Sequence, residues 1–168
     1  KYQDESGMWY QIVNYGGMDK NYLETSGSSI MAYALLKGVR LGILPESYVE
    51  YAKKAIDGIC DKYLKTKEGE MSLGGICLVA GLGGKDRRPG TYDYYMSEPI
   101  VEDDAKGVGP IIMYIVSFAG REESVRERLS KKSFALRFTI FLALFLGIAV
   151  FGVYGIGYES SQFIYNQF

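Results

Sequence analysis

Histidine is absent from this chain of 168 residues, which has only two cysteines and a formal net charge of −1. Without histidine the chain lacks the commonest general base and the commonest metal ligand, so acid–base chemistry would need carboxylates, tyrosine, lysine or cysteine. Cys60 and Cys77 lack the CxxC spacing of a zinc site, and we interpret them as small buried hydrophobic residues. The charge balance provides no basic field, so nucleic acid is not an expected partner.

The first half of the chain predicts two consecutive helices. Residues 23–42 show a helical pattern that Thr25 or Ser26 can cap, with an apolar face that includes Ile30, Tyr33, Ala34 and Leu41. Residues 44–64 follow the i, i+3, i+4, i+7 rule closely. Because only a few residues join these helices, we expect them to pack antiparallel.

The second half of this region is rich in glycine and acidic residues. Residues 71–84 are typical of a short hairpin or an extended loop, and a third helix is predicted to begin near Lys106. Glu102, Asp103 and Asp104 precede that helix, but they lack the alternate spacing and the terminal glutamate of a calcium loop. We therefore expect Asp104 to cap the helix, a contribution of about 0.5–2 kcal/mol.

An uncharged apolar run, FTIFLALFLGIAVFGVYGIGY, occupies residues 138–158 and follows a basic stretch. About 20 such residues span a bilayer, so the run predicts a single transmembrane helix and a membrane partner. The basic residues before it place residues 1–137 on the cytoplasmic side by the positive-inside rule. If the tail belongs to a different natural protein, a cytoplasmic location is expected instead.

Five segments, taken in order and spacing, resemble one family of enzymes. They are GMWYQ (7–11), NYLETSGS (21–28), KGVRLG (37–42), GGICLVAGLGG (74–84) and YDYYMSEPIVEDDAKGVGPII (92–112). Together they resemble the C-terminal third of the unsaturated rhamnogalacturonyl hydrolases, which are related to the unsaturated glucuronyl hydrolases. The resemblance covers residues 5–116 and does not extend to residues 121–168.

The resemblance implies an all-α fold, the C-terminal portion of an (α/α)6 barrel. It also implies a glycoside hydrolase that removes a 4,5-unsaturated uronic acid from pectin-derived oligosaccharides. In that mechanism an aspartic acid protonates the C4=C5 enol ether, water adds at C5, and the resulting hemiketal opens and releases the sugar. Neither a metal nor an organic cofactor is implied, and the implied partner is an unsaturated uronyl oligosaccharide.

In the resembling family the general acid lies before the segment that corresponds to residues 7–11. We therefore expect this chain to be a piece of a longer protein, to hold no catalytic residue and to be inactive alone. Its predicted parts are the barrel portion (1–118), a basic linker (119–137), the membrane helix (138–158) and a short tail (159–168). A membrane-anchored, non-catalytic interaction protein and a truncated or fused reading frame remain as alternatives.

The candidates for substrate binding are six residues on loops at the implied barrel mouth: Trp9, Tyr10, Glu24, Ser26, Asp104 and Lys106. The ring of Trp9 or Tyr10 can stack on a sugar face, and the Lys106 ammonium can meet a uronate carboxylate. Core packing is the alternative for Trp9. A helix cap with a local ion pair is the alternative for Asp104 and Lys106.

Overall fold

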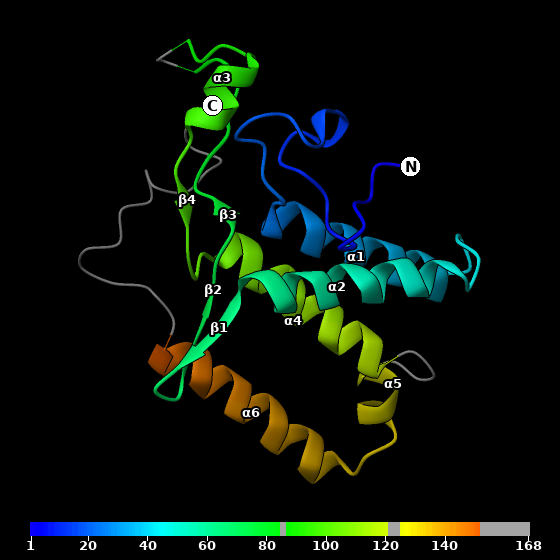
Figure 1. The fold of residues 1–168 in the computed structure, drawn as a ribbon. Coiled ribbons are helices and arrows are strands. Elements are labelled where there is room, and N and C mark those ends of the chain that lie inside the picture. The colour runs from blue at the N-terminus through cyan, green and yellow to red at the C-terminus, as the bar shows by residue number, and fades with distance from the viewer. Residues whose placement is uncertain (85–86, 121–124, 152–168) are drawn as a thin grey trace. The chain divides into compact units, whose positions relative to one another are not determined.

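The structure is a computed structural model that describes residues 1–84, 87–120 and 125–151 (Figure 1). The chain divides into two units, Lys1–Arg121 and Glu122–Phe168. In the described residues, the first unit contains three long helices, shorter helical turns and two small sheets, and the second contains α5 (Val125–Ser130) and α6 (Phe134–Phe151).

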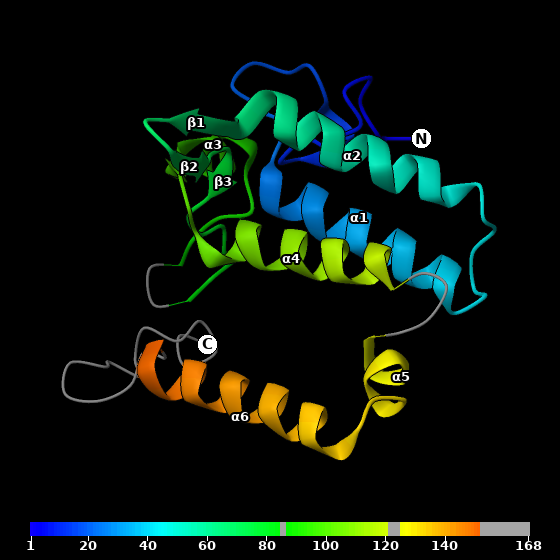
Figure 2. The same ribbon diagram turned by 90° about the horizontal axis from the view of Figure 1, so that it is seen from below.

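The three long helices of the first unit are α1 (Thr25–Arg40), α2 (Tyr48–Tyr63) and α4 (Ala105–Ala119). Figure 2 shows α1 between α2 and α4. The three predicted helices are confirmed, and so is the antiparallel packing of α1 on α2. Two further short helical elements are a 3₁₀ turn, η1 (Val13–Tyr15), and α3 (Tyr92–Ser97).

The core of the first unit is built from small residues on α1. Its buried positions are Thr25, Ser28, Ser29, Ala32 and Leu36, whereas Ile30 and Leu41 of the predicted apolar face are 51% and 59% exposed. The predicted face is therefore wrong. Small side chains in this stripe let the neighbouring helices approach α1 closely, and hydrogen bonds satisfy the buried hydroxyl groups.

Two clusters of buried residues make up this core. One lies between the three helices and consists of Ala32, Leu36, Val49, Ala52, Ala55 and Tyr114. The other lies near the sheets and consists of Met8, Leu23, Ile59, Leu73 and Ile76. The second cluster joins the amino-terminal loop to α2 and to the strands, so it fixes the end of the unit at which the candidate site lies.

Two antiparallel sheets of two strands each follow α2. β1 (Leu64–Lys67) pairs with β2 (Glu70–Leu73), and β3 (Ile76–Cys77) pairs with β4 (Ile100–Val101). Glu68 and Gly69 connect β1 to β2 with φ angles of 54° and 86°, as a tight two-residue hairpin requires. The fold is mostly helical with small antiparallel sheets, so the prediction of an all-α portion of an (α/α)6 barrel is wrong.

The predicted transmembrane helix over residues 138–158 is also wrong. α6 has 18 residues, begins at Phe134 and includes Arg137 in its first turn. Within residues 1–84, 87–120 and 125–151, no helix is long and apolar enough to cross a membrane. Residues 152–158 of the predicted span lie outside the described residues.

Candidate functional site

The amino-terminal turn of α1 is the point where three segments of the first unit meet. The Thr25 backbone N–H and hydroxyl donate to the carbonyl oxygens of Gly75 and Gly74, both at 2.8 Å. The Ser28 hydroxyl accepts from the backbone N–H of Trp9 at 2.9 Å. These contacts tie the amino-terminal loop and the β2–β3 connection to one helix end, so the local geometry there is strongly constrained.

Glu24 caps α1 instead of the predicted Thr25 or Ser26. Its Oε2 accepts from the backbone N–H of Gly27 at 2.5 Å, and its Oε1 accepts from the Ser26 hydroxyl at 2.8 Å. Oε1 also accepts from the backbone N–H of Cys77 at 3.0 Å. The residue is only 4% exposed. Three hydrogen bonds and the positive end of the helix therefore offset the cost of burying this carboxylate.

Two further ionisable groups lie close to the Glu24 carboxylate. Burial raises the pKa of the Cys77 thiol, and the Glu24 charge acts in the same direction. Burial also raises the pKa of the Tyr22 hydroxyl, with smaller contributions from Cys77 and Glu24. Both groups are therefore held in their neutral forms beside a buried carboxylate at neutral pH.

The start of α4 has a similar cap. The Asp104 carboxylate accepts from the backbone N–H of Lys106 and pairs with the Lys106 ammonium, both at 2.8 Å. Burial raises the pKa of Asp104, but its hydrogen bonds and charge interaction with Lys106 outweigh this and the pKa lies below its ordinary value. The predicted cap at Asp104 is confirmed.

A cavity of about 550 Å³ lies between the amino-terminal ends of α1 and α4. Ser26 and Lys106 both line it, so two of the predicted site residues share one pocket. Glu24 is hydrogen-bonded to Ser26 and Asp104 to Lys106, so these four residues form two hydrogen-bonded pairs, one at the start of each helix. The remaining lining residues are Gly27, Ile30, Ala105, Gly109, Pro110 and Met113.

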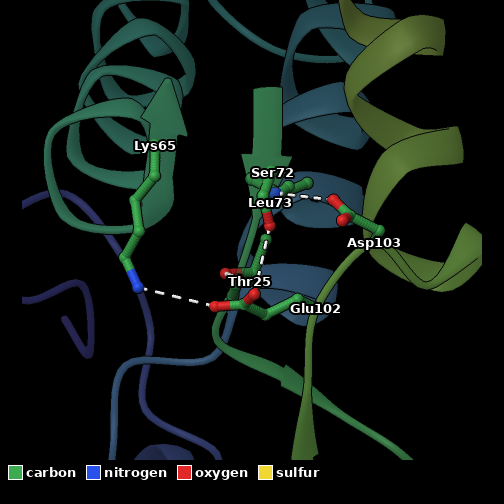
Figure 3. A network of polar contacts seen from close by, with 7 residues as sticks. Thr25, Lys65, Ser72, Leu73, Glu102 and Asp103 are labelled. Atoms are coloured by element: carbon green, nitrogen blue, oxygen red, sulfur yellow. Dashed lines mark hydrogen bonds and ion pairs between the residues drawn. The ribbon is translucent and has the colours of Figure 1, made fainter. Parts of the chain in front are cut away.

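The other two acids of the 102–104 stretch bind the β1–β2 hairpin. Figure 3 shows Asp103 directed at Leu73, whose backbone N–H donates to Asp103 Oδ1 at 2.7 Å. Glu102 accepts from the Ser72 hydroxyl at 3.2 Å and pairs with Lys65 at 3.5 Å (Figure 3). Each acid of the stretch thus has its own structural partners, and Asp104 is the one that pairs with a lining residue of this pocket, Lys106.

Trp9 and Tyr10 lie away from this pocket. Trp9 packs beside the cluster between the helices and lines a different cleft, of about 760 Å³, together with Leu35, Tyr48, Tyr51 and others. The Tyr10 ring packs against the cluster near the sheets, and its hydroxyl donates to Asp4 at 3.4 Å. The structure therefore separates the two aromatic candidates from Ser26 and Lys106.

Several pocket residues were not among the predicted ones, although helical spacing could have found them. Ile30 follows Ser26 by one turn, and Gly109, Pro110 and Met113 follow Lys106 on the same face of α4. The backbone N–H of Cys77 is different, because its contact with Glu24 joins residues 53 apart in the sequence. No local pattern indicates such a contact.

Comparisons with known proteins point to one enzyme family. The sequence profile of Glycosyl Hydrolase Family 88 matches residues 1–121. Protein Atu3128 of Agrobacterium fabrum and the 24.9 kDa protein in the picA locus of Rhizobium radiobacter are each 44% identical over 118 residues. Those residues are 66% of this chain and 51% of each relative, so the chain spans about half the length of these curated relatives.

Solved structures show the same relationship. A family 105 glycoside hydrolase from C. acetobutylicum is 50% identical with a TM-score of 0.66, over 70% of this chain and 33% of that one. A possible family 105 member from Klebsiella pneumoniae is 26% identical with a TM-score of 0.56, over 70% and 27%. The fold of the first unit thus recurs as part of larger proteins.

Proposed function

The chain belongs to Glycosyl Hydrolase Family 88, and on that premise we propose that its first unit contributes a sugar-binding pocket to a hydrolase of unsaturated uronyl oligosaccharides. The reaction we propose for the whole enzyme removes a 4,5-unsaturated uronic acid from pectin-derived oligosaccharides by hydration of the enol ether. The proposed ligand of this chain is the unsaturated uronyl sugar. The observation that carries the proposal is the pocket shared by Ser26 and Lys106.

One cationic group of this pocket suits a uronate. Lys106 supplies an ammonium at the rim, whereas the partial positive charges of the α1 and α4 amino-terminal ends are already met by the Glu24 and Asp104 carboxylates. Asp104 holds the ammonium in place at 2.8 Å and leaves it partly accessible, because the Lys106 side chain is 34% exposed. A bound uronate carboxylate would share this ammonium with Asp104.

The other walls of the pocket suit the ring of a sugar. Ile30 and Met113 present apolar surface from α1 and α4, and the Ser26 hydroxyl presents a polar atom between them. Gly109 leaves open space, since a Cβ at this position would meet no atom of another element within 4 Å. A few polar groups among apolar walls are the usual composition of a small-molecule site.

We assign no general acid within this chain. The pKa of Asp104 lies below its ordinary value, which is the wrong direction for an acid that must stay protonated near neutral pH. Both oxygens of Glu24 already accept hydrogen bonds from groups of the protein. The proposal is therefore that the chain binds the sugar and that it does not cleave it by itself.

Calorimetric titration of the whole chain with an unsaturated uronyl disaccharide tests the proposal. We expect Lys106→Ala to weaken binding by about tenfold or more, which is the loss of one charge-assisted hydrogen bond. Lys54→Ala is the matched control, because Lys54 lines the other cleft. The ultraviolet absorbance of the C4=C5 bond, followed in the same samples, should stay constant.

Two outcomes would count against this function. One is an absence of binding by the unaltered chain, and the other is an equal loss of affinity in the Lys54→Ala and Lys106→Ala variants. A saturated uronyl disaccharide serves as the comparison ligand. Equal affinity for both sugars would show that the pocket does not distinguish the unsaturated ring from the saturated one, and that part of the proposal would be wrong.

A further inference from the structure

We infer that Glu24 is a positioning residue of the sugar pocket, one that orients Ser26 and holds β3 against α1 without contacting the sugar. The inference rests on the proposed function, because Ser26 is taken to meet the ligand. It assigns separate roles to two adjacent side chains. Ser26 lies on the pocket wall, and Glu24 lies behind it.

The hydrogen bonds of Glu24 reach both local and distant parts of the chain. Oε2 accepts from the backbone N–H of Gly27, which is an ordinary helix cap. Oε1 accepts from the Ser26 hydroxyl and from the backbone N–H of Cys77, which lies in the short strand β3. One carboxylate thus connects the pocket wall, the first turn of α1 and a strand from later in the sequence.

The burial of Glu24 argues against a direct contact with the sugar. The residue is 4% exposed and does not line the cavity, whereas its hydrogen-bond partners Ser26 and Gly27 do. Because the Ser26 hydroxyl donates its proton to Glu24, its lone pairs remain as acceptors. Glu24 therefore makes the Ser26 hydroxyl a hydrogen-bond acceptor for a hydroxyl group of the ligand.

A shorter side chain with the same carboxylate distinguishes the positioning role of Glu24 from simple helix capping. Aspartate is among the best capping residues, so Glu24→Asp retains the charge and the cap at Gly27. Its carboxylate is one methylene closer to the backbone and loses its reach to Cys77. Glu24→Gln instead retains the length, but it replaces one acceptor oxygen by a donor group.

The experiment measures two quantities in the full chain: hydrogen exchange of the Cys77 amide and the affinity for an unsaturated uronyl disaccharide. We expect both Glu24→Asp and Glu24→Gln to raise the Cys77 exchange rate and the Kd by about tenfold, which is the loss of one net hydrogen bond. Ser26→Ala should weaken binding and leave Cys77 exchange unchanged. Glu50→Asp is the control, since the Glu50 side chain is 75% exposed on α2.

Each outcome has a distinct meaning. If Glu24→Asp exchanges and binds as the unaltered chain does, Glu24 is only a helix cap and the inference is wrong. If the unaltered chain binds no disaccharide, the proposed function fails, and the positioning role in a sugar site fails with it. In that case Cys77 exchange still shows whether Glu24 holds β3, so the two failures are distinguishable.

Discussion

The carboxylate of Glu24 accepts a hydrogen bond from the backbone N–H of Cys77, 53 residues further along the chain, at 3.0 Å. This contact links the start of α1 to β3, and β3 in turn pairs with β4 directly before the acidic stretch. The two helix starts that form the pocket are therefore connected through one small sheet. Changes in that sheet are expected to alter the pocket as well as the stability of the unit.

Gly107 and Gly109 form a matched pair for testing how closely α4 packs. A Cβ at Gly107 would lie 2.6 Å from Cδ1 of Ile76, whereas one at Gly109 would meet nothing within 4 Å apart from its chain neighbours and its own helix backbone. We expect Gly107→Ala to lower the free energy of unfolding by about 1–3 kcal/mol through overpacking. Gly109→Ala should change it by less than about 1 kcal/mol, because the gain in helix propensity is opposed by crowding of the new Cβ against the ring of Pro110. Urea denaturation measures both, and equal effects would refute the close approach.

Asp103 stabilises the hairpin through an unusual backbone conformation. Its φ angle is 58°, and its carboxylate accepts from the backbone N–H of Leu73. Asp103→Ala should cost about 1–3 kcal/mol, because it leaves that N–H without this acceptor and places alanine in the left-handed region. Asp103→Asn retains an acceptor oxygen and tolerates this conformation, so its cost should stay below about 1 kcal/mol. A similar loss for both variants in thermal unfolding would contradict this explanation.

The ion pair at Asp104 predicts a pH dependence of stability. Because the pKa of Asp104 is lower in the folded chain than its ordinary value of 3.8, its contribution to stability is present above that value. The contribution is lost as the pH falls through the folded pKa. Asp104→Asn keeps a good capping residue and removes the charge, so the difference between the two chains measures the contribution of the Asp104 charge to stability.

We expect Asp104→Asn to be less stable than the unaltered chain at neutral pH, by up to about 1 kcal/mol for a partly exposed pair. The difference should shrink as the pH falls below about 4. Glu50→Gln, which removes an exposed carboxylate from α2, provides the reference profile. A constant difference for Asp104→Asn across this range would show that the ion pair contributes nothing.

Periodicity and capping rules predicted a substantial part of the first unit. The three long helices appear where the sequence predicted them, although the apolar face of α1 was wrong, and Asp104 caps α4 as its position before Lys106 indicated. These features depend on residues within a few positions of one another. Local sequence therefore contains the necessary information.

Features that depend on distant residues were not predictable in this way. The buried stripe of α1 consists of Thr25, Ser28, Ser29, Ala32 and Leu36, because two helices pack on it and small residues fit between them. β3 and β4 have two residues each, which is too short for an alternation of apolar and polar residues to show in the sequence. The two strands are also more than twenty positions apart. The apolar run after Arg137 predicted a membrane helix from hydropathy alone. Among the described residues, however, no helix is long and apolar enough to cross a membrane.

The candidate site shows the same division between local and distant information. Family resemblance placed Ser26 and Lys106 near one another, and the structure places both on one cavity. It also places Trp9 on a separate cleft. The capping role of Glu24, through the backbone N–H of Gly27, was missed because glutamate is not among the usual capping residues. Its other contact, with the backbone N–H of Cys77 in β3, joins residues that are distant in the sequence.

The most direct test of the central claim is a map of amide chemical shifts in the full chain, titrated with an unsaturated uronyl disaccharide. We predict that the perturbed amides lie at the starts of α1 and α4, around Ser26, Gly27, Lys106 and Gly109. Ser26→Ala and Lys106→Ala should reduce those shifts at equal ligand concentration. An absence of shifts, or shifts confined to the cleft at Trp9, Tyr48 and Tyr51, would contradict the assignment of this pocket.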